Sequence, residues 1–300
     1  MIVSMSNMLI VGGLGYLGAA LGSFVGAQVW RLRARQLQED AAQGERVNKA
    51  EVARLHGLIR PVLVDRSECL HCHHELMWYD LLPIVSWLTL GGRCRYCHKQ
   101  IGATELLVEI GLAAVFIVSY LSWPFGTGTL FGVASLALWL IACVLMAVLF
   151  IYDAKWFLLP LSVNVSLILV AFIFAVLRFA AQGVDMSSIL SIVAAVGFMA
   201  GLYYVFSLFG WVGLGDSILG VGLALLLGKW ELAFLGLFIA NLLGCMMLVP
   251  LALRGKLHRN AHIPFGPFLI LGTVISLLWG GEIITIVFAW SDTLLNLLMV

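Results

Sequence analysis

Residues 137–155 read ALWLIACVLMAVLFIYDAK, an apolar run that carries no charged side chain until Asp153, close to its end. A helix that crosses a bilayer needs about 20 mostly apolar residues, so this run predicts a transmembrane helix. An ionised carboxylate in such a helix costs roughly 2.5–3.5 kcal/mol at the centre on insertion scales, and less near the interface. An acid retained in this setting indicates a functional site.

The composition indicates that most of the chain lies in a membrane. Its residues are 62% hydrophobic and 11% charged, whereas a soluble domain has about 25% charged residues. We predict an all-α polytopic membrane protein with about eight transmembrane helices and no cleavable signal sequence. The sixth candidate span is short and rich in glycine. The spans expected from hydrophobicity are 8–30, 104–122, 129–151, 157–179, 188–210, 214–228, 231–253 and 266–290.

The basic residues predict the orientation. Eleven of the 17 Lys and Arg residues lie between Arg31 and Lys99. Positive residues near helix ends favour the cytoplasm, which places residues 31–103 there and both chain termini outside. Asp153 and a second acid, Asp216 at the start of the sixth span, then share the cytoplasmic face. The expected divisions are a first transmembrane helix (1–30), a cytoplasmic domain (31–103) and a seven-helix catalytic region (104–300), with a polar arm at 31–60.

Two CxxC motifs separated by 21 residues lie in the polar segment, at Cys69 and Cys72 and at Cys94 and Cys97. Four thiolates at this spacing can complete a tetrahedron around Zn²⁺, and so small a domain usually needs a disulfide or a bound metal ion for stability. We therefore predict structural zinc, with the basic rim at Arg93 and Arg95 offsetting thiolate charge. Two disulfides are disfavoured in a reducing cytoplasm, and a redox CxxC pair lacks its usual fold context. The neighbouring histidines are alternative ligands: His71, His73, His74 and His98. Cys143 and Cys245 are expected to pack as small hydrophobes.

Asp153 and Asp216 together suit peptide hydrolysis without a metal. One ionised carboxylate can activate water as a general base, while its protonated partner donates to the scissile carbonyl. Gly213 and Gly215 permit a tight bend and a close helix approach beside Asp216. Alternatively, Asp153 pairs with Lys155 at the interface and Asp216 caps its helix. The sequence does not distinguish which acid begins as the base.

Further motifs occur around these sites in a fixed order along nearly the whole chain, and together they resemble the type IV prepilin peptidases, the GxGD aspartyl proteases of the bacterial inner membrane. The elements that carry the resemblance are Gly22-Ser23-Phe24, Trp78-Tyr79-Asp80-Leu81-Leu82-Pro83, Gly92-Arg93-Cys94-Arg95, Glu105-Leu106-Leu107-Val108-Glu109, Tyr152-Asp153, Leu159-Pro160, Gly213-Leu214-Gly215-Asp216 and Ile263-Pro264-Phe265-Gly266-Pro267.

The resemblance implies that Asp153 and Asp216 are catalytic and that the substrates are type 4 prepilins or pseudopilins. Their basic leader would be cut after a glycine on the cytoplasmic side of the inner membrane. It also implies a second reaction, methylation of the new N-terminus with S-adenosylmethionine. The expected partners are these substrates and the lipid bilayer, with no nucleic acid. The chain departs from the family pattern at Val25 to Gln28, at Leu161 and at Ser217.

Two other functional classes fit parts of the pattern. A transporter could use Asp153 and Asp216 to bind protons or cations, but coupling sites usually lie nearer the bilayer midplane. A non-catalytic assembly protein could use the zinc domain to dock cytoplasmic partners. Glu105 and Glu109, one turn apart at the start of the second span, are expected to stabilise that helix N-terminus or to bind a cationic leader.

Overall fold

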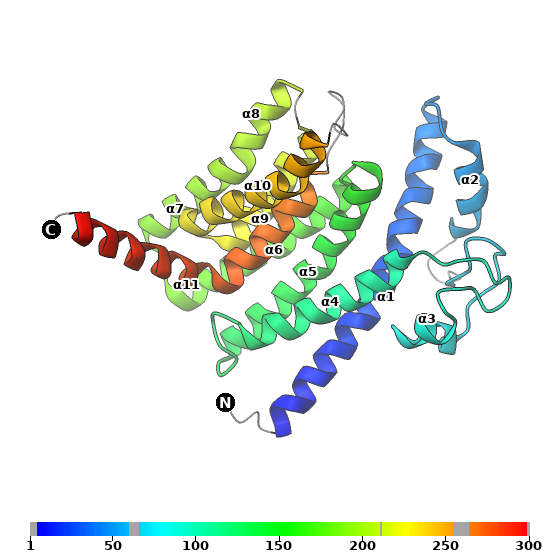
Figure 1. Ribbon diagram of the computed structural model, residues 1–300, viewed down its shortest axis with the longest axis horizontal. Helices are drawn as coiled ribbons and strands as arrows, with labels where there is room; N and C mark the ends of the chain where they lie inside the picture. The colour runs from blue at the N-terminus through cyan, green and yellow to red at the C-terminus, as the bar shows by residue number, and fades with distance from the viewer. Residues whose placement is uncertain (1–4, 60–65, 211, 255–263, 299–300) are drawn as a thin grey trace. The chain divides into compact units, whose positions relative to one another are not determined.

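A computed structural model describes residues 5–59, 66–210, 212–254 and 264–298 of the chain. Helices dominate these ranges, which contain no strand and only two isolated β-bridges, both in the cysteine segment. The predicted all-α class is therefore confirmed. The chain divides into two compact units, Met1–Tyr120 and Leu121–Val300 (Figure 1). The expected boundaries at residues 30 and 103 stay a prediction.

Close contact between helix α1 (Met5–Ala42) and helix α4 (Ala103–Leu121) organises the first unit. Gly18, Gly22 and Gly26 recur every four residues along one side of α1. A Cβ atom would lie 2.8 Å from the Ala113 Cα at Gly18, and 2.6 Å from the Glu109 Cα at Gly22. Small residues at this spacing let two membrane helices pack backbone to backbone. The glycines thus define the contact face of α1.

Helix α1 continues beyond the predicted end of the first span, and the polar arm folds back on its extension. Helix α2 (Lys49–Leu55) begins at the N-cap Asn48 and is followed by the 3-10 turn η1 (His56–Leu58). The Arg33 Nε lies 3.1 Å from the Glu51 Oε1, which ties the two helices together. Apolar side chains form a small core between them: Ala34, Leu37, Leu55 and Leu58. The arm is therefore an ordered helical hairpin as far as residue 59.

In the described part of the chain, seven helices are long and apolar enough to cross a membrane, and they coincide with seven of the eight predicted spans. Helices α1 and α4 of the first unit are two of them, and the second unit holds the others. The sixth predicted span is the shorter helix α9 (Leu214–Leu227), whose 14 residues rise about 21 Å, less than a bilayer core of about 30 Å. The other elements of this unit are α5 (Leu130–Trp156), α6 (Leu161–Gln182), α7 (Met186–Val196), the π-helical segment η3 (Gly197–Gly201), α8 (Leu202–Leu208), α10 (Trp230–Leu253) and α11 (Gly266–Leu298).

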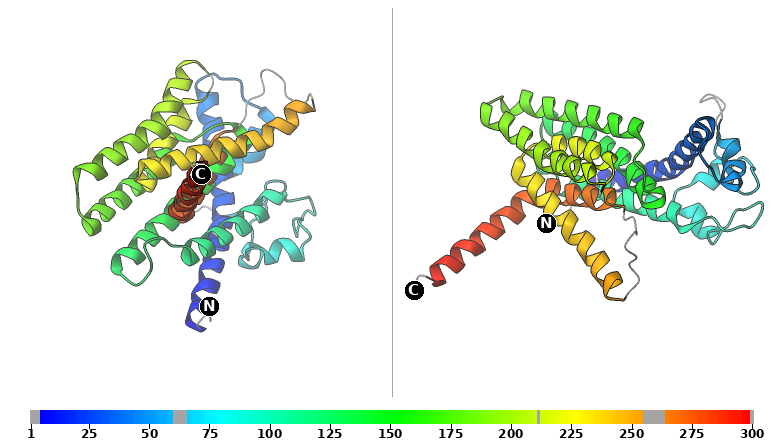
Figure 2. Two further views of the ribbon diagram at one scale, coloured as in Figure 1. Left: turned by 60° about the vertical axis from the view of Figure 1, so that its left-hand side comes forward. Right: turned by 90° about the horizontal axis from the view of Figure 1, so that it is seen from above.

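Helix α9 lies inside the second unit, in contact with α6, η3, α8 and α11 (Figure 2). Leu219, Leu223 and Leu226 on this helix are completely buried. A Cβ at Gly220 would lie 2.4 Å from the Met199 carbonyl oxygen, so glycine is needed for the approach of η3. A helix that is apolar on all sides belongs in a core. Because neighbouring helices surround it, α9 has no need of the length of a lipid-exposed span.

The contact of α1 with α4 predicts that Gly22→Ala destabilises the first unit. The new methyl group would overlap the α4 backbone, and overpacking of this kind costs about 1–3 kcal/mol. Thermal unfolding of the purified protein, compared with wild type, measures the effect. Gly111→Ala on α4 is the control, because no described atom beyond its own helix lies within 4 Å of the added Cβ. Equal stability of the two variants would contradict the proposed contact.

Candidate active site

Asp153 lies in the last turn of α5, where the helix has a defined end. Phe157 adopts a left-handed conformation with φ of 56°, and its N–H donates to the Asp153 carbonyl oxygen at 2.8 Å. Pro160 then precedes α6, since proline suits the beginning of a helix. The Asp153 side chain is only 5% exposed. The chain thus turns sharply just after a buried carboxylate.

The start of α11 holds the Asp153 carboxylate. The backbone N–H of Gly266 donates to the Asp153 Oδ2 at 2.9 Å. A Cβ atom at Gly266 would lie 2.8 Å from the same oxygen, closer than packing allows. Glycine at this position therefore lets the backbone donor reach the acid. The Phe265-Gly266-Pro267 motif contributes a direct partner of Asp153, a role that sequence reasoning had not assigned.

Asp216 lies in the first turn of α9, after the N-cap residue Gly213, whose carbonyl accepts from the Asp216 N–H at 3.1 Å. The Asp216 side chain is 8% exposed. Among the described residues, the Asp216 Oδ1 has no hydrogen-bond partner although it is buried. The alternative role of helix cap is not what the structure shows, because Gly213 occupies the cap position.

The two acids lie in one site formed by the end of α5, the start of α9 and the start of α11. Leu159 links these elements: a Cβ at Gly215 would lie 3.0 Å from the Leu159 Cβ, and one at Gly266 would lie 3.5 Å from the Leu159 Cδ2. The carboxyl groups of Asp153 and Asp216 are close enough to interact electrostatically. The structure therefore brings together the acids that the sequence singled out, with Gly215 at the contact between helices.

Two further groups beside Asp216 were not found from the sequence. Tyr203 interacts electrostatically with the Asp216 carboxyl group, and its ring centroid lies 5.3 Å from that of Phe265. The π-helical segment η3 disrupts the usual helix bonding next to α9, and the Ser217 hydroxyl donates to the Ala200 carbonyl at 2.9 Å. Such π-segments often occur at functional sites. Ser217, one of the departures from the family pattern, therefore stabilises this irregular wall.

The four predicted cysteines form a second site, within the first unit. The sulfur atoms of Cys69, Cys72, Cys94 and Cys97 all lie within 4.8 Å of one another, and the Cys69 and Cys97 sulfurs are 3.9 Å apart. Tetrahedral zinc with bonds of about 2.3 Å would separate its sulfur ligands by about 3.8 Å. All four thiols are free of disulfides. The group could hold a metal ion and fits a zinc knuckle.

The two CxxC motifs form equivalent knuckles. In each, the first cysteine N–H donates to the carbonyl five residues later, at 3.0 Å from Cys69 to His74 and at 2.9 Å from Cys94 to Lys99. In each, the histidine after the second cysteine has a positive φ, 55° at His73 and 57° at His98. Within the described segments, the metal-binding group contains thiols and no histidine. These histidines therefore shape the turns.

Backbone donors affect the thiols unequally. Burial opposes ionisation of Cys94, but the N–H groups of Cys97 and Tyr96 donate to its sulfur and lower its pKa to about 7. Burial raises the pKa of Cys69 to about 12, although the N–H groups of His71 and Cys72 oppose the shift. A bound cation would favour the thiolate form of both, because metal ligands must be deprotonated.

Asp80 connects the motif at 78–83, WYDLLP in one-letter code, to the second knuckle, which contains Cys94 and Cys97. Its Oδ1 accepts from the Arg95 Nε at 2.7 Å, and its Oδ2 accepts from the Tyr96 hydroxyl at 3.2 Å. Arg95, which was expected to offset thiolate charge, thus pairs with Asp80 and lies over the Tyr79 ring. The sequence did not predict this link, although Asp80 lies inside the motif at 78–83.

Glu105 and Glu109 have structural partners within the first unit. The Glu109 Oε2 accepts from the Ile84 N–H at 2.7 Å, and the Glu105 Oε1 accepts from the Trp30 indole at 3.3 Å. Glu109 is buried, and Ile84 has an unusual φ of 63°. Glu109 therefore anchors the loop after the WYDLLP motif to α4, a role that differs from helix-end stabilisation.

Comparison with known proteins identifies the family. Residues 16–123 match the model of the bacterial peptidase A24 N-terminal domain. Over 232 residues, the chain is 34% identical to a prepilin leader peptidase/N-methyltransferase of Aeromonas hydrophila, with 74% of each chain covered. The chain belongs to the prepilin leader peptidase/N-methyltransferase family. It is also 31% identical over 283 residues to the Pseudomonas aeruginosa enzyme of that name, with 89% of each chain covered. No solved structure matches the chain.

Membership in the prepilin leader peptidase/N-methyltransferase family confirms the resemblance drawn from the ordered motifs. The matched N-terminal domain begins within α1 and ends after α4, so it contains the cysteine cluster, Asp80 and Glu109. The similarity to the Pseudomonas aeruginosa relative extends over most of the chain. The chain is thus a multi-pass membrane enzyme of this family.

The contacts of Asp80 predict that Asp80→Asn loosens the second knuckle. An amide cannot form the ion pair with Arg95, so the segment around Cys94 and Cys97 should be cleaved faster in limited proteolysis. Glu39→Gln on α1, which removes an exposed acid far from the knuckle in sequence, should leave the cleavage rate unchanged. Unaltered cleavage of the Asp80 variant would contradict the anchoring role.

Proposed function

We propose that the chain is an intramembrane aspartyl endopeptidase that removes the leader peptide of type 4 prepilins and pseudopilins. The observation that carries the proposal is that two buried carboxyl groups, Asp153 and Asp216, lie on different helices of one apolar unit, close enough to interact electrostatically. Buried acids in membrane segments are costly and usually functional. Curated relatives named prepilin leader peptidase/N-methyltransferase support the choice of substrate.

The arrangement supports general acid–base hydrolysis. The Gly266 N–H engages one oxygen of Asp153 and fixes the plane of that carboxylate, which leaves the other oxygen for water or substrate. The Asp216 Oδ1, buried and without a partner in the described residues, can bond to a substrate group. One carboxylate would take a proton from water while the protonated other donates to the scissile carbonyl. The pair then titrates as a unit, and either acid can begin as the base.

The proposed location of the reaction follows from the expected threading. Residues 31–103 carry most of the basic residues and are assigned to the cytoplasm of a bacterial inner membrane, with both termini outside. Asp153 lies in the last turn of α5 and Asp216 in the first turn of α9, so both acids would face that side. A basic leader in the cytoplasm would present its cleavage site there. A transporter is less well supported, because its coupling site would lie nearer the midplane.

We propose methylation of the new N-terminus as the second reaction. Its support is the name of the curated relatives, which includes N-methyltransferase. S-adenosylmethionine would supply the methyl group.

Substitution of either acid tests the peptidase proposal. Asp153→Asn and Asp216→Asn should each lower the rate of prepilin cleavage by at least about 100-fold, because an amide neither accepts nor donates the required proton. Gel or mass analysis of purified enzyme with a prepilin measures the rate. Glu282→Gln, which neutralises an exposed acid on α11, is the matched control and should cleave normally. Cleavage by both aspartate variants at the wild-type rate would exclude the mechanism.

We also propose that the ion held by the cysteine cluster is structural zinc. Elemental analysis should find one zinc per wild-type chain and a clear loss in Cys97→Ser, because three thiolates bind the metal less tightly than four. Cys245→Ser, at an exposed cysteine on α10, should retain the metal. Loss of zinc should increase proteolysis of the knuckles. Chelation that stopped cleavage with no structural change would contradict a structural role.

A further inference from the structure

The second unit contains a pocket of about 770 Å³ at the ends of α6 and α9 that lie away from the aspartates. Asp153 and Asp216 flank the start of α6 and the start of α9, whereas the pocket is lined by Arg178 near the end of α6 and by Gly228 after α9. A rise of 1.5 Å per residue along α9 separates the two places by about 20 Å. The pocket is therefore distinct from the proposed peptidase site.

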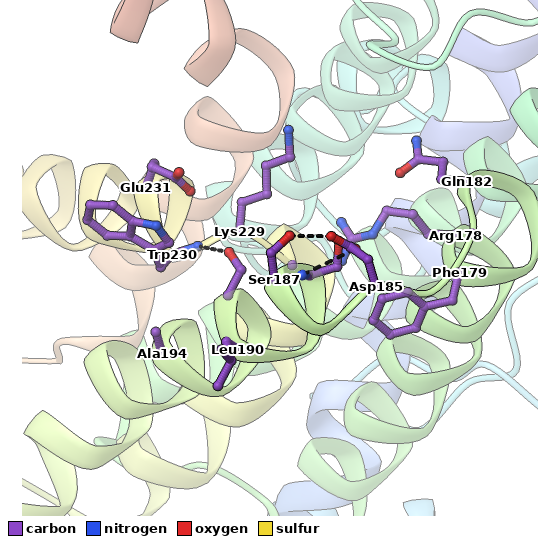
Figure 3. A pocket seen from close by; sticks show the side chains of 14 residues that line it. Arg178, Phe179, Gln182, Asp185, Ser187, Leu190, Ala194, Lys229, Trp230 and Glu231 are labelled. Atoms are coloured by element: carbon purple, nitrogen blue, oxygen red, sulfur yellow. Dashed lines mark hydrogen bonds between the residues drawn. The ribbon is translucent and has the colours of Figure 1, made fainter.

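The pocket collects two unusual cations. Of the 17 Lys and Arg residues, only Arg178 and Lys229 lie outside the segments assigned to the cytoplasm, and both line this one pocket. They come from different parts of the chain, Arg178 from α6 and Lys229 from the link between α9 and α10 (Figure 3). Basic residues are depleted on the outer side of membrane proteins, so the presence of two at one pocket calls for a specific reason.

Arg178 is rigidly held and only partly satisfied. Its Nη1 donates to the Leu227 carbonyl at 3.0 Å, and its guanidinium lies 5.9 Å from the centre of the Phe174 ring. A Cβ at Gly228 would lie 1.2 Å from the Nη2, so glycine leaves the room that the guanidinium occupies. The side chain is 8% exposed, yet within the described structure its Nη2 has no hydrogen-bond partner. An unpaired buried cationic donor favours an anionic ligand.

The acids around the pocket do not neutralise this pair by direct contact. Asp185 is the N-cap of α7, and its carboxylate accepts from the Ser187 hydroxyl and the Ser188 N–H (Figure 3). Glu231 lies in the first turn of α10, where an acid stabilises the helix N-terminus. Both α7 and α10 begin at this pocket, and their positive ends also favour an anion.

The surroundings indicate a lipid rather than a small solute. The same three helices expose large apolar side chains, including Val176 on α6, Val193 on α7 and Phe234 on α10. Trp230 at the rim is 44% exposed, as expected for an aromatic anchor at the interface between lipid and water. We propose that the pocket binds the phosphate of a phospholipid headgroup, with Arg178 and Lys229 as its ligands and the acyl chains along the apolar helix faces.

Titration of the purified full chain, in a phosphate-free maltoside detergent, tests this site. The probe is dioctanoyl phosphatidylglycerol, and native mass spectrometry measures its binding. We expect saturable binding of one lipid that Lys229→Gln weakens about five-fold, the effect of one cation near a lipid surface. Arg254→Gln removes an exposed cation after the opposite end of α10 and should change nothing. Arg178→Gln should weaken binding further, but it also removes the hydrogen bond from Arg178 to the Leu227 carbonyl. Lys229→Gln leaves that bond intact, so its effect on lipid binding is independent of folding.

Two further ligands identify the source of the phosphate. Dioctanoylglycerol, which lacks phosphate, should show no saturable binding, and an equal concentration of inorganic phosphate should not displace the lipid. Equal binding of dioctanoylglycerol, or an equal loss in the Lys229 and Arg254 variants, would overturn the proposal. Displacement by inorganic phosphate would assign the pocket to a small anion and overturn the proposal that its ligand is a phospholipid.

Discussion

The hydrogen bond from the Gly266 N–H to the Asp153 carboxylate is the contact on which the second unit depends. A carboxylate among apolar helices needs a donor, and here the backbone N–H reaches it because Gly266 has no Cβ, which would lie 2.8 Å from the accepting oxygen. This fixes the start of α11 against the end of α5, with Leu159 filling the space toward Gly215. Helix α9 can then bring Asp216 to the same place from the centre of the bundle. Gly215 and Gly266 thus each correspond to a close approach between elements.

The first unit follows a similar logic with different chemistry. Glycines along α1 bring its backbone onto α4, and Glu109 of α4 then accepts from the Ile84 N–H in the cysteine domain. Asp80 connects that domain to its second knuckle. Within this unit, the buried Glu109 therefore holds the small cysteine domain to α4, Asp80 holds the second knuckle inside that domain, and the four sulfur atoms bring the two knuckles together.

The sequence predicted what depends on local pattern. Long apolar runs located the helices, the CxxC spacing located the cluster, and the rarity of acids in apolar runs located Asp153 and Asp216. Contacts between distant residues were not predictable in this way: Gly266 and Asp153 are 113 residues apart, and nothing in either segment alone specifies their bond. Hydrophobicity located α9 as a short, glycine-rich span, but it does not distinguish burial in protein from exposure to lipid, so the burial of this helix among its neighbours was not predicted. From the sequence, Asp80 was only part of a motif and Glu109 was only an acid at the start of a helix. Their hydrogen-bond partners depend on tertiary folding and were not predicted.

We propose that the wild-type chain cleaves a prepilin at the aspartate site and then methylates the product. The most direct measurement is the mass of the pilin after incubation with the purified enzyme, with and without S-adenosylmethionine. We expect loss of the leader in both reactions, and one added methyl group on the new N-terminus only when the cofactor is present. A prepilin that keeps its full mass in both reactions, with correctly folded enzyme, would contradict it.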